Sequence, residues 1–166
     1  MKIRRATQSD IPVITAIHIE SWKDSYPDVL PAEFLAGSIK RDLAHHWNEI
    51  EIQNEDIVLV AEQDSLVAFI AVWCRPTAFI DNLHVRPSQR SNKVGSTLMK
   101  TVAKELISKG HKTAYLWVIK SNLKAIRFYH HLGGLQKELS MKTVFGYDIL
   151  SRKIEWDNIS AICENQ

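Results

Sequence analysis

The sequence has few of the residues that would link it to metals, disulfides or membranes. Its 166 residues include two cysteines, Cys74 and Cys163, which form neither a disulfide framework nor a metal-ligand motif. The seven histidines add no zinc spacing, so no metal is predicted. No apolar run reaches the ~18 residues of a membrane span, and the N-terminal segment turns polar too early for a signal peptide. These absences predict a cytoplasmic protein without membrane partners.

Glycine and proline are also sparse, with six and five residues, and no linker or repeat interrupts the chain. With 45% hydrophobic residues the chain is long enough to bury a core. It is too short for two full domains, so a single domain is predicted over residues 1–166. Residues 157–166 are expected to form a mobile tail.

Hydrophobic periodicity predicts a chain that alternates strands and helices. The expected elements are a strand at 2–6, a helix from 11 to about 26, a helical region at 31–53 interrupted at Gly37, strands at 56–62, 66–73 and 78–85, a helix at 95–109, a strand at 112–119, a helix at 122–132, and strands at 135–139 and 143–156 joined by a loop near 140–142. This order predicts an α/β (α+β) protein with a mixed sheet of about seven strands and helices on both faces.

Charge is divided unevenly along the chain, although the net charge is only +2. Residues 86–131 contain ten Lys and Arg and one acid, Glu105, whereas residues 1–85 are rich in Asp and Glu. A cationic region favours a phosphate-bearing ligand, and an acidic region favours a cationic amine. Nucleic acid could use the basic region, but no recognisable module of aromatic residues accompanies it, so no nucleic-acid partner is predicted.

The segment 86–96 lies between a predicted strand and a predicted helix. The first N–H groups of a helix have no intrahelical partners and carry the positive end of the helix dipole, so a loop feeding them can hold a phosphate. One glycine in such a loop is a weak signal by itself. The segment nevertheless favours a pyrophosphate ligand.

A second segment, residues 112–134, makes the interpretation of segment 86–96 more specific. A strand-like run leads to the pattern Asn-x-x-Ala-x-x-Phe-Tyr-x-x-x-Gly, formed by Asn122, Ala125, Phe128, Tyr129 and Gly133. Together the two segments resemble the acyl-CoA-binding half of the GNAT superfamily of N-acetyltransferases, from about Val58 to Gly134. The resemblance implies the GNAT fold, in which the strands at 78–85 and 112–119 splay apart to receive the pantetheine arm of acetyl-CoA.

The resemblance also implies which residues bind the co-substrate. Leu83, His84 and Val85 would hold the pantetheine arm by backbone hydrogen bonds, in the manner of strand addition. The remaining implied cofactor residues are Arg90, Ser91, Asn92, Lys93, Val94, Gly95, Ser96, Asn122 and Tyr129. Lys93 stands where the family usually has its first glycine. If the backbone there needs a positive φ, lysine costs about 1 kcal/mol, and its ammonium could partly compensate at a phosphate.

The implied reaction transfers the acetyl group of acetyl-CoA to a primary amine by direct attack through a tetrahedral intermediate. The acceptor would be a small molecule, or a peptide N-terminus or lysine. Tyr129 sits at the family's general-acid position, and a phenol with a pKa near 10 suits a leaving thiolate. On composition alone Tyr129 would be a core residue, and Asn122 would be a helix N-cap.

The general base remains open between two residues of one strand. Trp117 occupies the position where ribosomal-protein N-terminal acetyltransferases have a glutamate, and it cannot accept a proton. Asp81 and His84 are the candidates, directly or through water, and their spacing puts them on opposite faces of a regular strand. Asp81 could equally serve a purely structural role.

Substrate binding is predicted for three aromatic residues, Trp22, Tyr26 and Trp73, with Asp24 and Asp28 nearby to attract an amine. They could equally be ordinary packing residues. A noncatalytic acyl-CoA-binding module is the alternative function, because Lys93 and Trp117 depart from the family pattern. The apolar final strands could support a homodimer.

Overall fold

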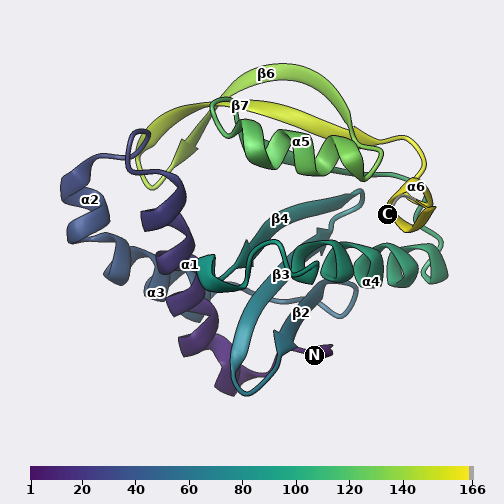
Figure 1. Cartoon of the computed structure of the whole chain (residues 1–166), viewed down its shortest axis with the longest axis horizontal. Coiled ribbons are helices and arrows are strands. Elements are labelled where there is room, and N and C mark those ends of the chain that lie inside the picture. Colours follow the sequence, from purple (N-terminus) through teal and green to yellow (C-terminus); the bar gives the residue numbers. More distant parts are fainter. Residues whose placement is uncertain (165–166) are drawn as a thin grey trace. The chain divides into compact units, whose positions relative to one another are not determined.

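The computed structural model describes residues 1–164, which form two compact units (Figure 1). The first unit contains residues 1–71 and 82–98, and the second contains residues 72–81 and the chain from Met99 onward. The single domain predicted from the length stays a prediction.

Seven strands form a mixed sheet flanked by helices, as predicted, in the order β1-β2-β3-β4-β5-β7-β6. The strands are β1 (Lys2–Arg5), β2 (Ile57–Glu62), β3 (Leu66–Cys74), β4 (Ala78–Val85), β5 (Ala114–Ile119), β6 (Leu135–Val144) and β7 (Tyr147–Trp156). β1 pairs with β2 antiparallel, and β4 pairs with β5 parallel. The α/β mixed-sheet prediction is therefore confirmed.

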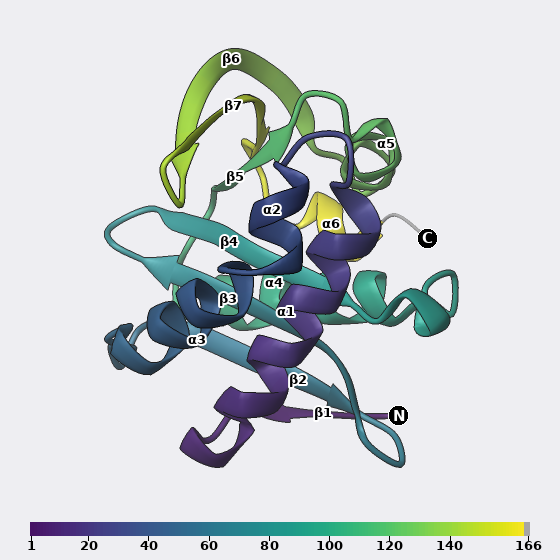
Figure 2. The same ribbon diagram turned by 90° about the vertical axis from the view of Figure 1, so that its left-hand side faces the viewer.

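Three helices belong wholly to the first unit: α1 (Ile11–Ser25), α2 (Ala32–Ala36) and α3 (Ile39–Glu49). Figure 2 shows α1 and α3 side by side over β2 and β3. The apolar side chains Ile14 and Ile17 of α1 and Leu43 of α3 are fully buried. A helix with an apolar stripe is stable only when the stripe is covered, so the predicted periodicity becomes the core of this unit. The predicted break at Gly37 separates α2 from α3.

An ion pair fixes the start of α1 to the sheet. Arg4 on β1 donates to both carboxylate oxygens of Asp10, at 2.7 and 3.0 Å, and also to Glu62 on β2 at 3.1 Å. The backbone N–H of Thr7 donates to Asp10 at 2.7 Å. The Arg4 guanidinium holds the pKa of Asp10 well below its usual range. This buried carboxylate therefore stays charged and paired, as a desolvated acid must.

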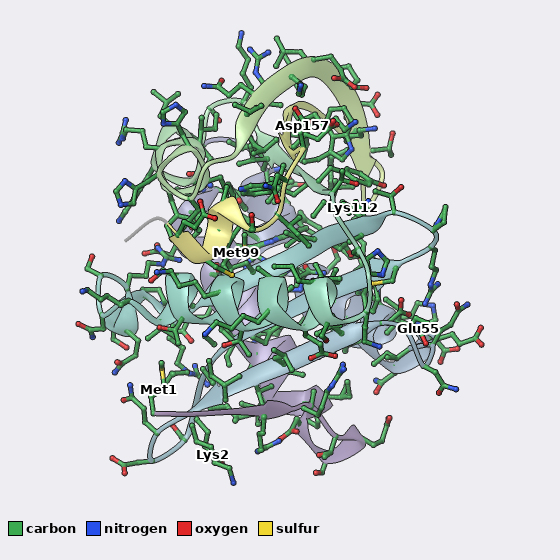
Figure 3. The ribbon with its side chains drawn as sticks, turned by 90° about the vertical axis from the view of Figure 1, so that its right-hand side faces the viewer. Met1, Lys2, Glu55, Met99, Lys112 and Asp157 are labelled. Atoms are coloured by element: carbon green, nitrogen blue, oxygen red, sulfur yellow. The ribbon has the colours of Figure 1, made fainter. Side chains whose placement is uncertain are left out.

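The second unit is built on an antiparallel sheet of β5, β7 and β6. β5 pairs with β7 from Ala114 and Trp156 to Ile119 and Ser151. Lys112 and Asp157 flank one end of this pair (Figure 3), where the C=O of Lys112 accepts from the N–H of Ile159. Alternation buries Leu116 and Val118 on one face of β5, as period-two patterning predicts.

Helices complete both units. α4 (Val94–Ser108) begins in the first unit and continues in the second, and α5 (Leu123–His131) belongs to the second. The N–H of Gly110, with φ +87°, donates to Ile107 just after α4. Glycine adopts this left-handed conformation without a steric cost, so it ends the helix as the sequence predicts.

Two details of the C-terminal prediction are wrong. β6 runs without a break through 140–142, where a loop was expected, and the hairpin turns instead at Phe145 and Gly146. These residues have φ values of +48° and +83°, as a two-residue turn that matches the strand twist requires. The expected mobile tail contains α6 (Ala161–Glu164) and buries Ile159 and Ile162. Residues 165 and 166 lie outside the described part of the chain.

Gly134 provides a test of the packing in the second unit. A Cβ there would lie 2.6 Å from Ile154 Cγ2, 2.9 Å from the Trp156 ring and 2.9 Å from the Tyr129 carbonyl oxygen. We expect Gly134→Ala to lower the free energy of unfolding by about 1–3 kcal/mol, because neighbouring atoms must move. Urea denaturation measures this.

The matched control is Gly110→Ala. A Cβ at Gly110 meets no atom within 4 Å, but its φ of +87° remains strained, at a cost of about 1 kcal/mol. If Gly134→Ala were no more destabilising than Gly110→Ala, close packing at Gly134 would not be a constraint on this unit.

Candidate functional site

The loop between β4 and α4 lies in the first unit and has an unusual backbone. Ser91 and Lys93 have φ values of 69° and 59°, in the left-handed region that non-glycine residues seldom adopt. The positive φ suspected at Lys93 is thus present. Such a conformation persists only where its surroundings hold it, and it recurs at binding sites.

The loop delivers the chain directly into the first turn of α4. The C=O of Lys93 accepts from the N–H of Thr97 at 2.9 Å, from the Thr97 hydroxyl at 2.8 Å and from the Ser96 hydroxyl at 2.9 Å. Val94, Gly95 and Ser96 belong to the first helical turn, whose N–H groups have no acceptor within the helix. These amides, together with the helix dipole, make a surface suited to an anion.

Two arginines tie this loop to α1. Arg86, just after β4, pairs with Glu20, and its Nε donates to the C=O of Leu66 at 3.1 Å. Arg90 pairs with Asp24. The Arg90 guanidinium also lies 3.3 Å from the Ser25 hydroxyl. The side chain of Arg90, predicted to bind the cofactor, therefore holds the loop in place in this structure.

Sequence reasoning missed these partners because it assigned the acids of α1 to the substrate. Glu20 and Asp24 are four residues apart, as are Ser21 and Ser25, so each pair lies on one side of α1. The recognisable signal was a stripe of four polar residues at positions 20, 21, 24 and 25 of this helix. Glu20 and Asp24 have the same spacing in the sequence as the two arginines that they pair with, which are also four residues apart.

The side chain of His84 faces the helices of the first unit. Its Nδ1 lies 2.9 Å from the Ser21 hydroxyl, and its ring stacks on that of His18 at 4.3 Å between centroids. His18 accepts a hydrogen bond at Nδ1 from Trp47 Nε1 at 3.0 Å. Because Nδ1 accepts, a neutral His18 carries its proton on Nε2, which is buried without a hydrogen-bond partner.

Both imidazoles are held in the neutral form. Burial, together with a smaller effect of the nearby Arg90 charge, lowers the pKa of His84 to about 3. Burial also holds the pKa of His18 well below its ordinary value, with a smaller effect from His84. Desolvation disfavours the charged form of a histidine, so neither ring takes a proton near neutral pH. His84 is therefore a poor acceptor for a proton from an ammonium group.

Asp81, the other candidate base, belongs to the second unit. It is exposed and accepts a hydrogen bond from Trp73 Nε1 at 2.9 Å. The guanidinium of Arg75 lies 5.7 Å from the centre of the Trp73 ring. Asp81 thus faces away from the side on which Asn82 is buried, as the predicted alternation along β4 requires.

Asn122 and Tyr129 lie on α5 of the second unit. The Asn122 side chain accepts from the N–H of Ala125 at 3.1 Å, which confirms its role as the N-cap. Tyr129 is half-buried, and its ring lies edge-on to that of Trp156 with 6.1 Å between centroids. The C=O of Tyr129 accepts from the N–H of Gly134 at 3.0 Å.

The predicted substrate residues divide between the two units. Trp22 and Tyr26, on α1 and just after it, lie edge-on with 6.1 Å between centroids, and both are half-buried. Trp73 belongs to the second unit, with Asp81 as its hydrogen-bond acceptor. The ammonium group of Lys142 lies over the Trp117 ring, with its Nζ 3.9 Å from the ring centre.

Within residues 1–164, no cluster of three or more His, Cys, Asp or Glu side chains could hold a metal ion. Cys74 and Cys163 form no disulfide there. A helix long and apolar enough to cross a bilayer is also absent from this part of the chain.

Comparison with known proteins identifies the family. Residues 14–133 match the Acetyltransferase (GNAT) family. An uncharacterised N-acetyltransferase of Archaeoglobus fulgidus is 30% identical over 138 residues, covering 78% of this chain and 89% of that protein. The spermidine N(1)-acetyltransferase of Thermoplasma acidophilum is 25% identical over 140 residues, covering 80% of this chain and 87% of that protein.

Solved structures share the fold. The PaiA N-acetyltransferase of Thermoplasma acidophilum, crystallised in complex with coenzyme A, superposes with a TM-score of 0.70 at 22% identity, covering 91% of this chain and 96% of that chain. This chain belongs to the acetyltransferase (GNAT) family. It is an acetyl-CoA-dependent N-acetyltransferase, with acetyl-CoA as its co-substrate.

The neutral histidines predict acid sensitivity. Between about pH 3 and 6.5 the folded chain binds fewer protons at His84 than the unfolded chain does. The contribution of the neutral His84 to the free energy of unfolding is therefore fully present above pH 6.5 and is lost as the pH falls toward 3. For His84 alone, lowering the pH to 5 should reduce the free energy of unfolding by about 2 kcal/mol. Urea denaturation from pH 8 to 5 measures the slope.

The control is His84→Gln, which removes the titrating group but keeps a polar side chain. We expect its stability to fall less steeply over the same pH range. The window lies above the range in which Asp10 titrates, so Asp10 does not contribute. An identical slope in the variant and the natural chain would exclude His84 as a source of the acid sensitivity.

Proposed function

We propose that this N-acetyltransferase acetylates a primary amine on a small molecule, with the β4–α4 loop as the site for the coenzyme A pyrophosphate. One observation carries the proposal: the left-handed residues Ser91 and Lys93 feed the first turn of α4, and the loop is tied to α1 by Arg86 and Arg90. Because the loop is already held in this form, it can present several amide N–H groups to one anion without a further entropy cost for ordering the loop.

The co-substrate residues follow from this placement and the family motif. The backbone amides of residues 91–96 would hold the diphosphate, and the backbone of Leu83, His84 and Val85 would hold the pantetheine arm by strand addition. The register pairs of β4 with β5 lie at Ala78 and Phe79, at the opposite end of β4, which supports this assignment. Asn122 and Tyr129 are the proposed cofactor contacts on α5.

Acetyl transfer needs a neutral amine, a stabilised oxyanion and a proton for the leaving thiolate. We propose that Tyr129 donates that proton. For the general base we favour Asp81 acting through water, because it is exposed, whereas His84 is buried against His18 and has a lowered pKa. His84 then serves to position the end of β4, with Ser21 as its partner.

A small amine is the favoured acceptor, with a peptide N-terminus or lysine as the alternative. The Thermoplasma relative named for spermidine supports an aliphatic polyamine. Trp22 and Tyr26 lie together and would provide apolar walls. Asp24 already pairs with Arg90, so attraction for an ammonium group would depend on other acids, such as the exposed Asp28. Trp73 remains a proposed contact.

We also propose a cytoplasmic location for this enzyme, which is supported by the two cysteines, Cys74 and Cys163, not forming a disulfide. Partners other than the amine and acetyl-CoA are not expected to include nucleic acid or membranes. Homodimer formation stays a prediction from the apolar final strands.

Lys93 allows the charge and the backbone of the loop to be tested separately. Lys93→Met keeps the strained backbone but removes the ammonium, and should weaken coenzyme A binding about 3- to 10-fold if that ammonium meets a phosphate. Lys93→Gly should weaken binding similarly while raising the free energy of unfolding by up to about 1 kcal/mol. Calorimetric titration and urea denaturation measure the two effects. Unchanged affinity in Lys93→Met would show that its charge does not contact the cofactor.

The acceptor and the catalytic acid can be tested in one assay. Purified protein is incubated with acetyl-CoA and a panel of polyamines, monoamines and peptides, while the free thiol of coenzyme A is followed. With the best acceptor, Tyr129→Phe should reduce kcat at least tenfold, because it removes the proton donor and little of the packing. Normal turnover in Tyr129→Phe would exclude the phenol as the acid.

The same panel decides the alternative function. Calorimetric binding of acetyl-CoA without turnover on any amine would favour a noncatalytic acyl-CoA-binding module. Turnover on peptides but not on polyamines would overturn the small-molecule proposal and keep the enzyme class.

A further inference from the structure

A stripe of aromatic side chains crosses the sheet of the second unit. Its four rings are half-buried and come from neighbouring strands: Trp73 on β3, Phe79 on β4, and Tyr115 and Trp117 on β5. Phe79 lies opposite Tyr115 in the register, and the two rings stack with 5.0 Å between centroids. Because alternate residues of a strand share a face of the sheet, Trp117 lies on the same face as Tyr115. We call these four residues the aromatic stripe.

An acid, Asp81, lies on the same face of the sheet as the aromatic stripe. It follows Phe79 by two residues on β4, so the two side chains share a face. Asp81 is exposed and accepts from Trp73 Nε1 at 2.9 Å, which joins Trp73 to the same face. A carboxylate beside aromatic rings suits an organic cation, because the negative charge and the negative face of a ring both attract it.

The chain places one of its own ammonium groups on the aromatic stripe. Lys142 Nζ lies 3.9 Å from the centre of the Trp117 ring, well inside the limit of about 6 Å for a cation–π contact. Within residues 1–164, Lys142 makes no ion pair with a carboxylate. The Trp117 ring is therefore the partner of this ammonium, and in this structure the ring holds an alkylammonium group.

A second cation on the stripe is held differently. Lys153 Nζ lies 5.1 Å from the centre of the Tyr115 ring, but it also pairs with Glu155 at 2.8 Å and with Glu138 at 4.0 Å. Moving Lys153 away would separate these two acids from their cation. The ring of Trp117 is therefore the part of the stripe whose cation is easier to exchange.

The position of Lys142 allows that exchange. It lies on β6, the last strand in the sheet order of the described chain, and its side chain is only partly buried. The flexible four-carbon stem of a lysine lets its ammonium turn into water. A cation–π contact at an exposed site changes a binding equilibrium by only about 2- to 5-fold. An ammonium group of a ligand can therefore replace Lys142 on Trp117 with a small loss of affinity.

We propose that the Trp117 ring is a subsite for an ammonium group of the acceptor, and that Lys142 occupies this subsite until the acceptor binds. The inference rests on the proposed function, in which Asp81 is the general base. The reacting nitrogen must be uncharged when it attacks, so it gains little from a cation–π contact. The group on Trp117 is therefore a second nitrogen that stays charged, and the acceptor is a diamine or polyamine.

Tetramethylammonium tests the subsite without acetyl transfer, because its nitrogen carries no proton and cannot be acetylated. NMR follows its binding through the indole N–H signal of Trp117, which is identified by its loss in Trp117→Phe. In Lys142→Met, which keeps a side chain of similar length without the charge, half-saturation should need about 2- to 5-fold less tetramethylammonium than in the natural chain. Lys142→Arg keeps a cation for the ring, so its half-saturation should stay close to the natural value.

Lys124→Met controls for the loss of one positive charge. Lys124 is exposed on α5, and the Tyr129 ring of this helix contacts Trp156. Trp156 lies opposite Ala114 in the register, so both side chains lie on the face of the sheet opposite to Tyr115. The helix therefore covers the other face of the sheet from the aromatic stripe. Lys124→Met should leave the affinity for tetramethylammonium unchanged.

Acceptor kinetics provide a second test. Diaminobutane and butylamine have the same carbon chain, and the ratio of their kcat/KM values measures the preference for a second ammonium. Trp117→Leu should lower this ratio by about 2- to 5-fold, and Lys142→Met should raise it by a similar factor. Circular dichroism checks that each variant is folded.

The two tests separate a failure of the subsite from a failure of the proposed function. Equal half-saturation by tetramethylammonium in Lys142→Met and the natural chain, or no shift of the Trp117 signal in either, would overturn the subsite even if amines are acetylated. A diamine preference that is the same in Trp117→Leu as in the natural chain would also overturn it. A shift of the Trp117 signal without turnover on any amine would overturn the proposed function and keep the cation subsite.

Discussion

The pairing of two loop arginines with two acids of α1 is the interaction on which the candidate cofactor site depends. Arg86 with Glu20 and Arg90 with Asp24 are partly exposed pairs, with side chains between 26% and 47% exposed. Exposed ion pairs contribute about 0–1 kcal/mol each to stability, so their main effect is on position. They hold a loop whose backbone at Ser91 and Lys93 is strained by about 1–2 kcal/mol per residue. The geometry of the candidate anion site is therefore set by a helix distant in sequence.

The buried histidines extend this arrangement into the core of the first unit. His84 at the end of β4 stacks on His18 of α1, and Trp47 of α3 donates to His18. The neutral state of both rings avoids the cost of a buried charge beside Arg90. A histidine that is buried between a strand and a helix in this way has a lowered pKa, and it is therefore a weak general base. Asp81, the proposed base, is exposed instead, and Trp73 Nε1 donates a hydrogen bond to it.

The sequence predictions were most accurate for features that depend on interactions between residues close together in the sequence. Local patterns located most strands and helices, because alternation and helical spacing need only neighbouring residues. They also identified the N-cap at Asn122, the helix end at Gly110 and the family pattern. The hairpin at Phe145 and Gly146 was missed because Ser140 to Lys142 looked polar enough for a loop. The stretch instead continues β6, where Ser140 and Lys142 alternate with Met141 and Lys142 reaches the Trp117 ring.

By itself the sequence determined the chemistry available: a basic loop before a helix, an Asn and Tyr on the next helix, and hence the enzyme class. These signals are local and depend on residue type and spacing. The tertiary structure decided which acids those arginines meet, which face His84 takes, and which edge of the sheet stays open. The pairings of the two arginines and of His84 join residues 63 to 66 positions apart, whose partners a linear pattern does not specify.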